Sequence, residues 1–375
     1  MKKMFHGYYT PTAEEFEALW NDSLIVLDAS ALLNLYSYSS TTLQEFLELL
    51  SKTKANAWLP YQAAAEYHRN RCRVIRNAEK KYEGILSDLR TVLNTFKAEK
   101  THPYIEPDLL KQLEDLSEKI IQSLTDSKES QKKIIREDLI RDRLNEIYDG
   151  QVGEQYSPQD LEKIYAEGKH RYADKVPPGF KDETKLGTRG YGDLVLWRQI
   201  IKESVKVGKG VIFVTDDEKP DWWLFNDTDK IGPRPELLQE FRTETTKDIY
   251  IYTSFSFAEH AKERGEKISE PALAELAAAD TARDDQQRER INMLRGPVAG
   301  YEDPQRELIN KLRGLFTLYE DPQRELINKL RGPVYEYEKQ QRKLDRSTRG
   351  EVYENDKLGR ELRRRLRGPF PENEE

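Results

Sequence analysis

The sequence has little cysteine, little histidine and no long apolar run. Its one cysteine, Cys72, excludes an internal disulfide and agrees with a reducing compartment. The five histidines show no spacing typical of ligands, so a histidine-based zinc site is not expected. No apolar run approaches the roughly 18 residues needed to span a membrane, and the N-terminal segment lacks the apolar core of a signal peptide. These absences predict a cytoplasmic protein without a membrane partner.

The chain also lacks an excess of positive charge, since its formal net charge is −7. A nucleic-acid ligand would therefore need a local basic surface. The best candidate segment follows Glu66 directly and contains Arg69, Arg71, Arg73, Arg76, Lys80 and Lys81. Charge runs are also common on solvated helix faces, so phosphate binding and simple solvation both stay open.

Short apolar runs are present, and they predict a parallel sheet. Residues 24–27 and 211–214 are continuous apolar stretches of the kind found in strands buried on both faces. Two further strands are expected at 57–59 and 248–252. Helical patterns follow the runs, and strands that alternate with helices are typical of an α/β fold.

Carboxylates stand at the ends of these elements. Asp28 and Asp217 follow two of the strands, Asp193 begins a helix, and Glu66 lies two turns into another helix. Functional sites in parallel sheets form beyond the carboxyl ends of the strands. Single aspartates at strand ends are often caps, but several together would repel one another or bind a cation, and Mg²⁺ prefers oxygen ligands.

The ordered set of these residues resembles the PIN domain family of metal-dependent nucleases, in particular its bacterial PIN-like branch. The resemblance covers about 20–265. Its specific matches are Asp28-Ala-Ser30, Glu66, Gly192-Asp193 and Thr215-Asp216-Asp217, within the stretches GDLVLW and VTDDEKPDWW. It implies a three-layer α/β/α sandwich around a short parallel sheet, and an endonuclease that hydrolyses phosphodiester bonds, in RNA in preference to DNA. Relatives in this branch often resemble toxins or antiphage defence effectors.

The resemblance also assigns roles to residues. The expected catalytic acids are Asp28, Glu66, Asp193 and Asp217, which would bind Mg²⁺ or Mn²⁺ together with Asp216. Ser30, which stands where many members have Asn, and Thr215 would support the site. We expect Arg69, Arg71, Arg73 and Lys219 to contact the nucleic acid.

The sequence also predicts how the chain divides into a domain, a linker and a repeat tail. Residues 1–265 would form the PIN-like domain, with a helical insertion at about 79–190, and 266–283 would be a linker. Residues 284–375 hold five units of 18 residues, in which YEDPQRELINKLRG at 301–314 recurs letter for letter at 319–332. Each unit would form a short helix with a narrow apolar stripe, marginal alone in water.

The repeats keep a second interpretation open. Their apolar stripes need a packing partner, so we expect self-association or a protein partner through this tail. The alternative to a nuclease is a catalytically silent PIN-like platform that acts through the repeats. The complete set of acids favours the nuclease, because a degenerate member would usually have lost some of them.

Overall fold

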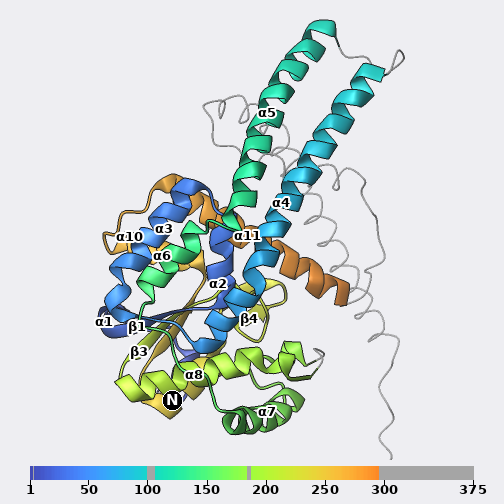
Figure 1. Ribbon diagram of the computed structural model, residues 1–375. Helices are drawn as coiled ribbons and strands as arrows, with labels where there is room; N and C mark the ends of the chain where they lie inside the picture. Colours follow the sequence, from blue (N-terminus) through green and yellow to red (C-terminus); the bar gives the residue numbers. More distant parts are fainter. Residues whose placement is uncertain (3, 99–105, 184–186, 295–375) are drawn as a thin grey trace, which may run out of the picture. The chain divides into compact units, whose positions relative to one another are not determined.

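The structure is a computed structural model, and it describes residues 1–2, 4–98, 106–183 and 187–294. The chain divides into two compact units, Met1–Gly300 and Tyr301–Glu375. The second unit lies outside the described residues, as do four of the five expected repeats. The fold described below is that of the first unit (Figure 1).

A four-stranded parallel sheet forms the centre of this unit. Its strands are β1 (Ser23–Leu27), β2 (Ala57–Trp58), β3 (Gly210–Val214) and β6 (Ile249–Tyr252), in the order β2-β1-β3-β6. The β1–β3 register pairs Ile25 with Ile212 and Leu27 with Val214, so both strands end at the same edge. The expected α/β fold with a short parallel sheet is confirmed.

Helices surround the sheet. They are α1 (Ala13–Asp22), α2 (Ala29–Asn34), α3 (Ser40–Lys52), α4 (Tyr61–Ala98), α5 (Pro107–Ile134), α6 (Leu139–Ile147), α7 (Pro158–Ala173), α8 (Gly192–Val207), α9 (Pro235–Thr245), α10 (Ser254–Glu263) and α11 (Glu270–Leu294). Short 3₁₀ turns lie at His6–Tyr8, Leu35–Ser37, Lys54–Asn56, Phe180–Asp182 and Gly187–Tyr191. Among the described residues, no helix is long and apolar enough to cross a membrane.

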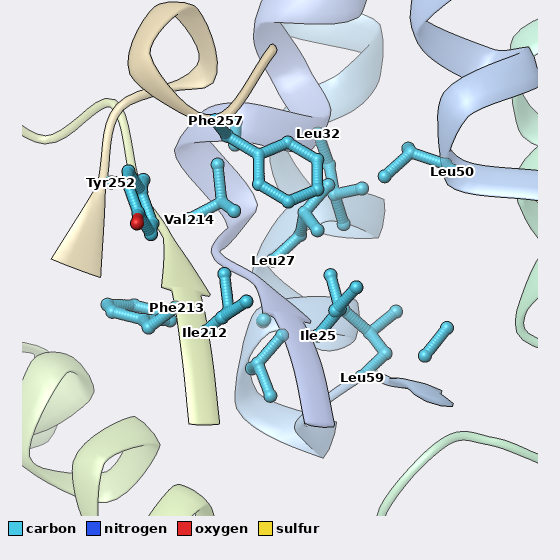
Figure 2. Close-up of a cluster of buried hydrophobic side chains, with 14 of the residues drawn as sticks. Ile25, Leu27, Leu32, Leu50, Leu59, Ile212, Phe213, Val214, Tyr252 and Phe257 are labelled. Carbon is cyan, nitrogen blue, oxygen red and sulfur yellow. The ribbon is translucent and has the colours of Figure 1, made fainter. Parts of the chain in front are cut away.

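The core explains why the apolar runs became strands. Side chains alternate across a strand, and on one face Phe213 contacts Trp222, which packs with Trp197 of α8. Figure 2 shows part of the core, where β1, β3 and β6 meet residues of α2, α3 and α10. Phe257 of α10 is fully buried in this core. Continuous burial on both faces matches the uninterrupted apolar sequence.

The expected insertion begins as an extension of a core helix. α4 starts at Tyr61 and runs without a break to Ala98, and α5 returns beside it (Figure 1). Ion pairs join the two helices, with Lys128 Nζ 2.8 Å from a Glu83 oxygen and Lys97 Nζ 3.1 Å from Glu114. The acid Glu66 and this arm therefore belong to one continuous helix.

A two-stranded hairpin follows the loop that carries Asp216 and Asp217, and the sequence did not predict it. Its antiparallel strands are β4 (Trp223–Asn226) and β5 (Asp229–Pro233). Asp227 in the turn has a φ of 55°, a conformation that Asp tolerates better than most residues. The turn itself is Asp227-Thr228, which lacks the glycine that marks most two-residue hairpin turns in a sequence.

The expected linker at 266–283 differs from the structure, because most of it forms α11. Ala272 and Leu276 of this helix are buried against the body of the unit. The helix then continues through residue 283 into the first expected repeat, up to Leu294. Ala-rich sequence favours a helix here, so residues 270–283 and the start of the first expected repeat form one continuous helix.

Candidate active site

Asp28 lies where β1 ends and α2 begins. Its side chain caps α2, because one carboxylate oxygen accepts the Ser30 N–H at 3.3 Å. The same oxygen accepts the hydroxyl of Ser30 at 2.6 Å and the hydroxyl of Thr215 at 3.1 Å. These donors fix the orientation of the carboxylate, with Asp28 only half-buried.

Ser30 and Thr215 also hold the loop that follows β3. The Ser30 hydroxyl accepts the N–H of Asp216 at 3.0 Å, and the Thr215 hydroxyl accepts the N–H of Asp217 at 3.2 Å. Each hydroxyl therefore joins Asp28 to the backbone that carries the next acids. The structure brings Ser30 and Thr215 to Asp28 as expected, while their support of a metal site stays a prediction.

Three aspartates converge on the ammonium group of Lys219. Its Nζ lies 2.7 Å from a carboxylate oxygen of Asp217, 3.1 Å from Asp182 and 3.3 Å from Asp193. Asp217 also accepts the Lys219 N–H at 3.1 Å, which makes a tight turn. Lys219 was expected to contact nucleic acid, but here it neutralises the acids, because a buried carboxylate needs a nearby positive charge.

The electrostatics show how strongly these acids interact. Burial raises the pKa of Asp193 well above its ordinary value, Lys219 opposes this shift, and Asp217 adds to it. Burial alone would lower the pKa of Lys219, but Asp193 and Asp217 outweigh it and raise the pKa above that of an ordinary lysine. Burial and then the charge of Asp217 raise the pKa of Asp28, against hydrogen bonds from Ser30. Burial is therefore the main reason why these two acids hold a proton more tightly than ordinary aspartates, and repulsion from Asp217 adds to it.

A fifth aspartate, Asp221, lies fully buried behind this group. One of its oxygens accepts the N–H groups of Gly179 and Lys181 at 3.1 and 3.2 Å. Gly179 is required there, because its φ is 92° and a Cβ would lie 2.2 Å from the Tyr172 hydroxyl oxygen. The other Asp221 oxygen is buried without a hydrogen-bond partner in the structure.

Glu66 lies in α4, a helix that packs against α8. One turn before it, the Gln62 N–H donates to the side chain of Gln199 in α8 at 2.9 Å. A Cβ placed at Gly192 would lie 3.2 Å from the Gln62 side-chain nitrogen. Residues four apart share a helix face, so Glu66 continues the face that meets the start of α8.

Asp216 was expected as a further metal ligand, and the structure places it elsewhere. Its oxygens accept the Asn34 amide at 2.7 Å and both the N–H and the hydroxyl of Ser254 at 2.9 Å. Arg283 of α11 adds an ion pair at 3.3 Å. Alternate residues of an extended segment point to opposite sides, so Asp216 faces α10 and α11 while Asp217 faces the acid group.

The same loop is tied to α11 through Glu218. Its carboxylate lies 2.8 Å from the Lys230 Nζ, which in turn lies 3.0 Å from Asp284. Burial raises the pKa of Glu218 to about 8, and Lys230 only partly offsets this. The first expected repeat therefore contributes Asp284 to contacts with the loop that carries the acids.

This raised pKa predicts a pH dependence of stability. The carboxyl group of Glu218 binds its proton more tightly in the folded protein than in the unfolded chain. The folded state therefore gains stability as the pH falls from about 8 toward the pKa that Glu218 has in the unfolded chain. Glu218→Gln should remove this pH-dependent contribution to stability. The difference in Tm between wild type and variant should therefore change between pH 8.5 and pH 6. Calorimetry at both pH values measures this, and a difference that stays constant with pH would contradict it.

The expected nucleic-acid contacts separate into two groups. Arg71 lies in a buried ion pair, with its Nη1 2.6 Å from Asp138, whose side chain is 0% exposed. Tyr36 donates to the same carboxylate at 2.8 Å. Arg71 therefore holds α4 to the segment before α6, a correction to its expected role. Arg69 and Arg73 are exposed on another side of α4.

The residues present fit a hard divalent cation by their chemistry. Carboxylate oxygens are the donors that Mg²⁺ and Mn²⁺ prefer, and one lysine ammonium is set against the group of Asp28, Asp182, Asp193, Asp217 and Asp221. The unpartnered oxygen of Asp221 shows that the group is not fully satisfied. Across the described residues, no group of three or more His, Cys, Asp or Glu side chains stands close enough together, as placed here, to hold a metal ion.

The sequence motifs did not assign a role to Asp182 or to Asp221. Asp182 ends a 3₁₀ turn in the loop after α7 and reaches Lys219 from there. Neither a strand end nor a helix start marks it, so no local pattern could have found it. Trp222 and Trp223, which follow Asp221, are 2% and 4% exposed and belong to the core.

The comparison with protein families supports the resemblance noted in the sequence. The model of a PIN like domain matches residues 24–237, which include all the acids of this site. No curated protein and no solved structure matched the chain. The match covers more than half of the sequence and runs from β1 through the start of α9. The chain therefore belongs to the family of PIN-like domains.

Proposed function

We propose that this protein is a metal-dependent endonuclease that hydrolyses phosphodiester bonds in RNA. The observation that carries the proposal is the convergence of Asp182, Asp193 and Asp217 on one ammonium group, beside Asp28 at the end of β1. A set of acids from four separate segments meets at one edge of the sheet. PIN domains are generally nucleases, and this edge is where such a fold forms its site.

The acids would hold Mg²⁺ or Mn²⁺, with Asp28, Asp193 and Asp217 as the central ligands and Glu66 at the border of the site. A divalent ion, when bound, lowers the pKa of a bound water and stabilises charge on the phosphodiester. Ser30 and Thr215 orient Asp28 through their hydroxyl groups. Exposed fractions of 18% for Asp193 and 21% for Asp217 leave the acids accessible from solvent.

A cleavage assay with metal add-back tests the proposal. The full-length protein is stripped with EDTA and then given Mn²⁺, Mg²⁺ or neither, with a fluorescent single-stranded RNA and the matching DNA as substrates. We expect cleavage of RNA with Mn²⁺ or Mg²⁺ and none in EDTA. No metal-dependent cleavage of either substrate would reject the nuclease and favour the catalytically silent platform.

The ammonium of Lys219 should compete with the metal ion. Lys219→Met removes one positive charge from among three acids, and at an effective dielectric constant near 20 such a charge is worth several kcal/mol at close range. We expect Mn²⁺ to bind at least about tenfold more tightly to this variant. Its Tm in EDTA should fall, because the acids lose their partner.

Isothermal titration with Mn²⁺ and calorimetry in EDTA measure the two effects. Lys230→Met is the matched control, since Lys230 pairs with Glu218 and α11 rather than with the acids of the site. Unchanged or weaker Mn²⁺ binding in Lys219→Met would show that the ammonium does not occupy the place of the metal.

A further inference from the structure

A row of cations on α4 begins where the acid site ends. The residues of this row are spaced four and three apart along the helix, which places them on one face. The members of the row, which we call the α4 stripe, are Arg69, Arg73, Arg76 and Lys80. Gln62 and Glu66 continue the same spacing toward the N-terminus of the helix, so the stripe and these two residues share a face.

The near end of this face is anchored at the site. The Gln62 side-chain nitrogen lies 3.2 Å from the place that a Cβ would take at Gly192, the residue before Asp193, and the Gln62 backbone N–H donates to Gln199 of α8. The stripe therefore leads away from the acids along the arm formed by α4 and α5 (Figure 1). Lys80 lies eleven positions after Arg69, which is about 16 Å along the helix.

All four stripe side chains are exposed. Arg69 donates to the Ala65 carbonyl at 3.2 Å and Arg73 to the Asn70 side chain at 3.0 Å, which leaves most of their N–H donors in solvent. Within the described part of the chain, no carboxylate forms an ion pair with any of the four. On the side of α4 that faces α5, by contrast, charged side chains are paired, since Glu79 and Glu83 form ion pairs with lysines of α5.

This arrangement has a cost that a polyanion would remove. Like charges three and four apart on a helix destabilise it by a few tenths of a kcal/mol per pair. The chain as a whole carries a net charge of −7, so four uncompensated cations in one line run against its composition. A continuous chain of phosphates offers one anion after another along such a line, and a basic track next to a site is how proteins bind single strands without reading sequence.

We propose that the α4 stripe is a phosphate-binding track for a single-stranded nucleic acid that extends from the acid site along the arm. This inference rests on the proposed nuclease function. Arg71, inside the ion pair with Asp138, is not part of the track. Because the stripe contacts the backbone, it holds the strand without selecting its bases.

Binding without cleavage tests the track. The probe is a fluorescein-labelled single-stranded RNA of 25 nucleotides, with the matching single-stranded DNA as a second arm. Fluorescence anisotropy of the full-length protein is measured in EDTA and again in Ca²⁺, between 50 and 200 mM salt. The stripe variant carries Arg69→Ala, Arg73→Ala, Arg76→Ala and Lys80→Ala.

The matched control variant removes four other exposed cations from α5 and the segment after it, Lys111, Lys119, Lys133 and Arg136, also to Ala. Each phosphate contact to a single strand contributes about 0.7 to the salt slope, so the stripe variant should lose roughly 3 from the slope and on the order of 100-fold in affinity at 100 mM salt. The control should lose much less. Equal loss of RNA and DNA binding in the stripe variant would support a backbone track in which the ribose is not read.

Three results would overturn the track: wild type that binds neither probe in either condition, a stripe variant with unchanged affinity and slope, or a control that loses as much as the stripe variant. Binding that depends on the stripe, together with no cleavage in Mn²⁺, supports the track and rejects the nuclease. Cleavage by a protein whose stripe variant binds normally rejects the track and keeps the nuclease.

Discussion

Asp193→Asn should reduce Mn²⁺-dependent RNA cleavage by about 1,000-fold or more, which corresponds to a loss of about 4 kcal/mol of transition-state stabilisation. The substitution keeps the shape of the side chain in the first turn of α8 but removes its charge and one anionic oxygen. Asp193 contacts Lys219 together with Asp217 and Asp182. An amide at this position would weaken the binding of the proposed metal ion.

The fold should survive this change. Burial raises the pKa of Asp193 well above its ordinary value, which means that the ionised form is disfavoured in the folded protein. A neutral amide therefore costs little, and the Tm in EDTA should stay within a few degrees of wild type. Asp88→Asn, an exposed position on the arm, serves as the control and should cleave normally. If Asp193→Asn cleaved RNA as fast as wild type, the cluster of acids around Lys219 would have no part in the reaction.

Asp138→Ala should have the largest effect on stability, about 3–5 kcal/mol in the free energy of unfolding. It leaves the Arg71 guanidinium, 12% exposed, without its carboxylate. It also removes the cap of α6, in which Asp138 accepts the Arg141 N–H at 2.9 Å, and the acceptor of the Tyr36 hydroxyl. A buried charge that loses its partner keeps its full desolvation cost.

Urea unfolding of a small set of variants separates these contributions. Asp138→Asn keeps an oxygen for the cap and for Tyr36 but removes the charge, so it should cost less than Asp138→Ala. Arg71→Met combined with Asp138→Asn should recover part of the loss, since no unpaired charge remains. A cost below about 1 kcal/mol for Asp138→Ala would contradict a structural role. Arg71→Met should leave the salt slope of RNA binding unchanged, in contrast to the stripe variant.

The parts of the fold that the sequence predicted are those with a local signal. β1 and β3 have continuous apolar runs because both faces of the sheet are covered, and Asp28 stands out because the first of these runs ends at it. Ser30 and Thr215 were assigned through the resemblance to PIN domains, and they lie beside Asp28 because the neighbouring parallel strands β1 and β3 end at the same edge of the sheet.

The parts that could not be predicted depend on side-chain direction and on long-range contacts. Asp216 and Asp217 are adjacent in sequence, and the direction of each depends on how α10 and α11 pack against the loop. Arg71 and Arg73 look equivalent in sequence, yet a partner 67 residues away takes one of them out of the exposed surface. Asp182 reaches the site from an irregular loop, and Lys219 reads as a surface cation until three acids are seen around it.

The central claim is that the acids at this edge of the sheet bind a divalent metal ion, and an electron paramagnetic resonance titration with Mn²⁺ tests it most directly. Free Mn²⁺ gives a strong signal that disappears on binding, so the measurement does not depend on any substrate. Wild type should remove Mn²⁺ from solution in a saturable way, and a variant with Asp28→Asn, Asp193→Asn and Asp217→Asn should leave it free. Equal Mn²⁺ binding by the two proteins, or none by wild type, would contradict the account.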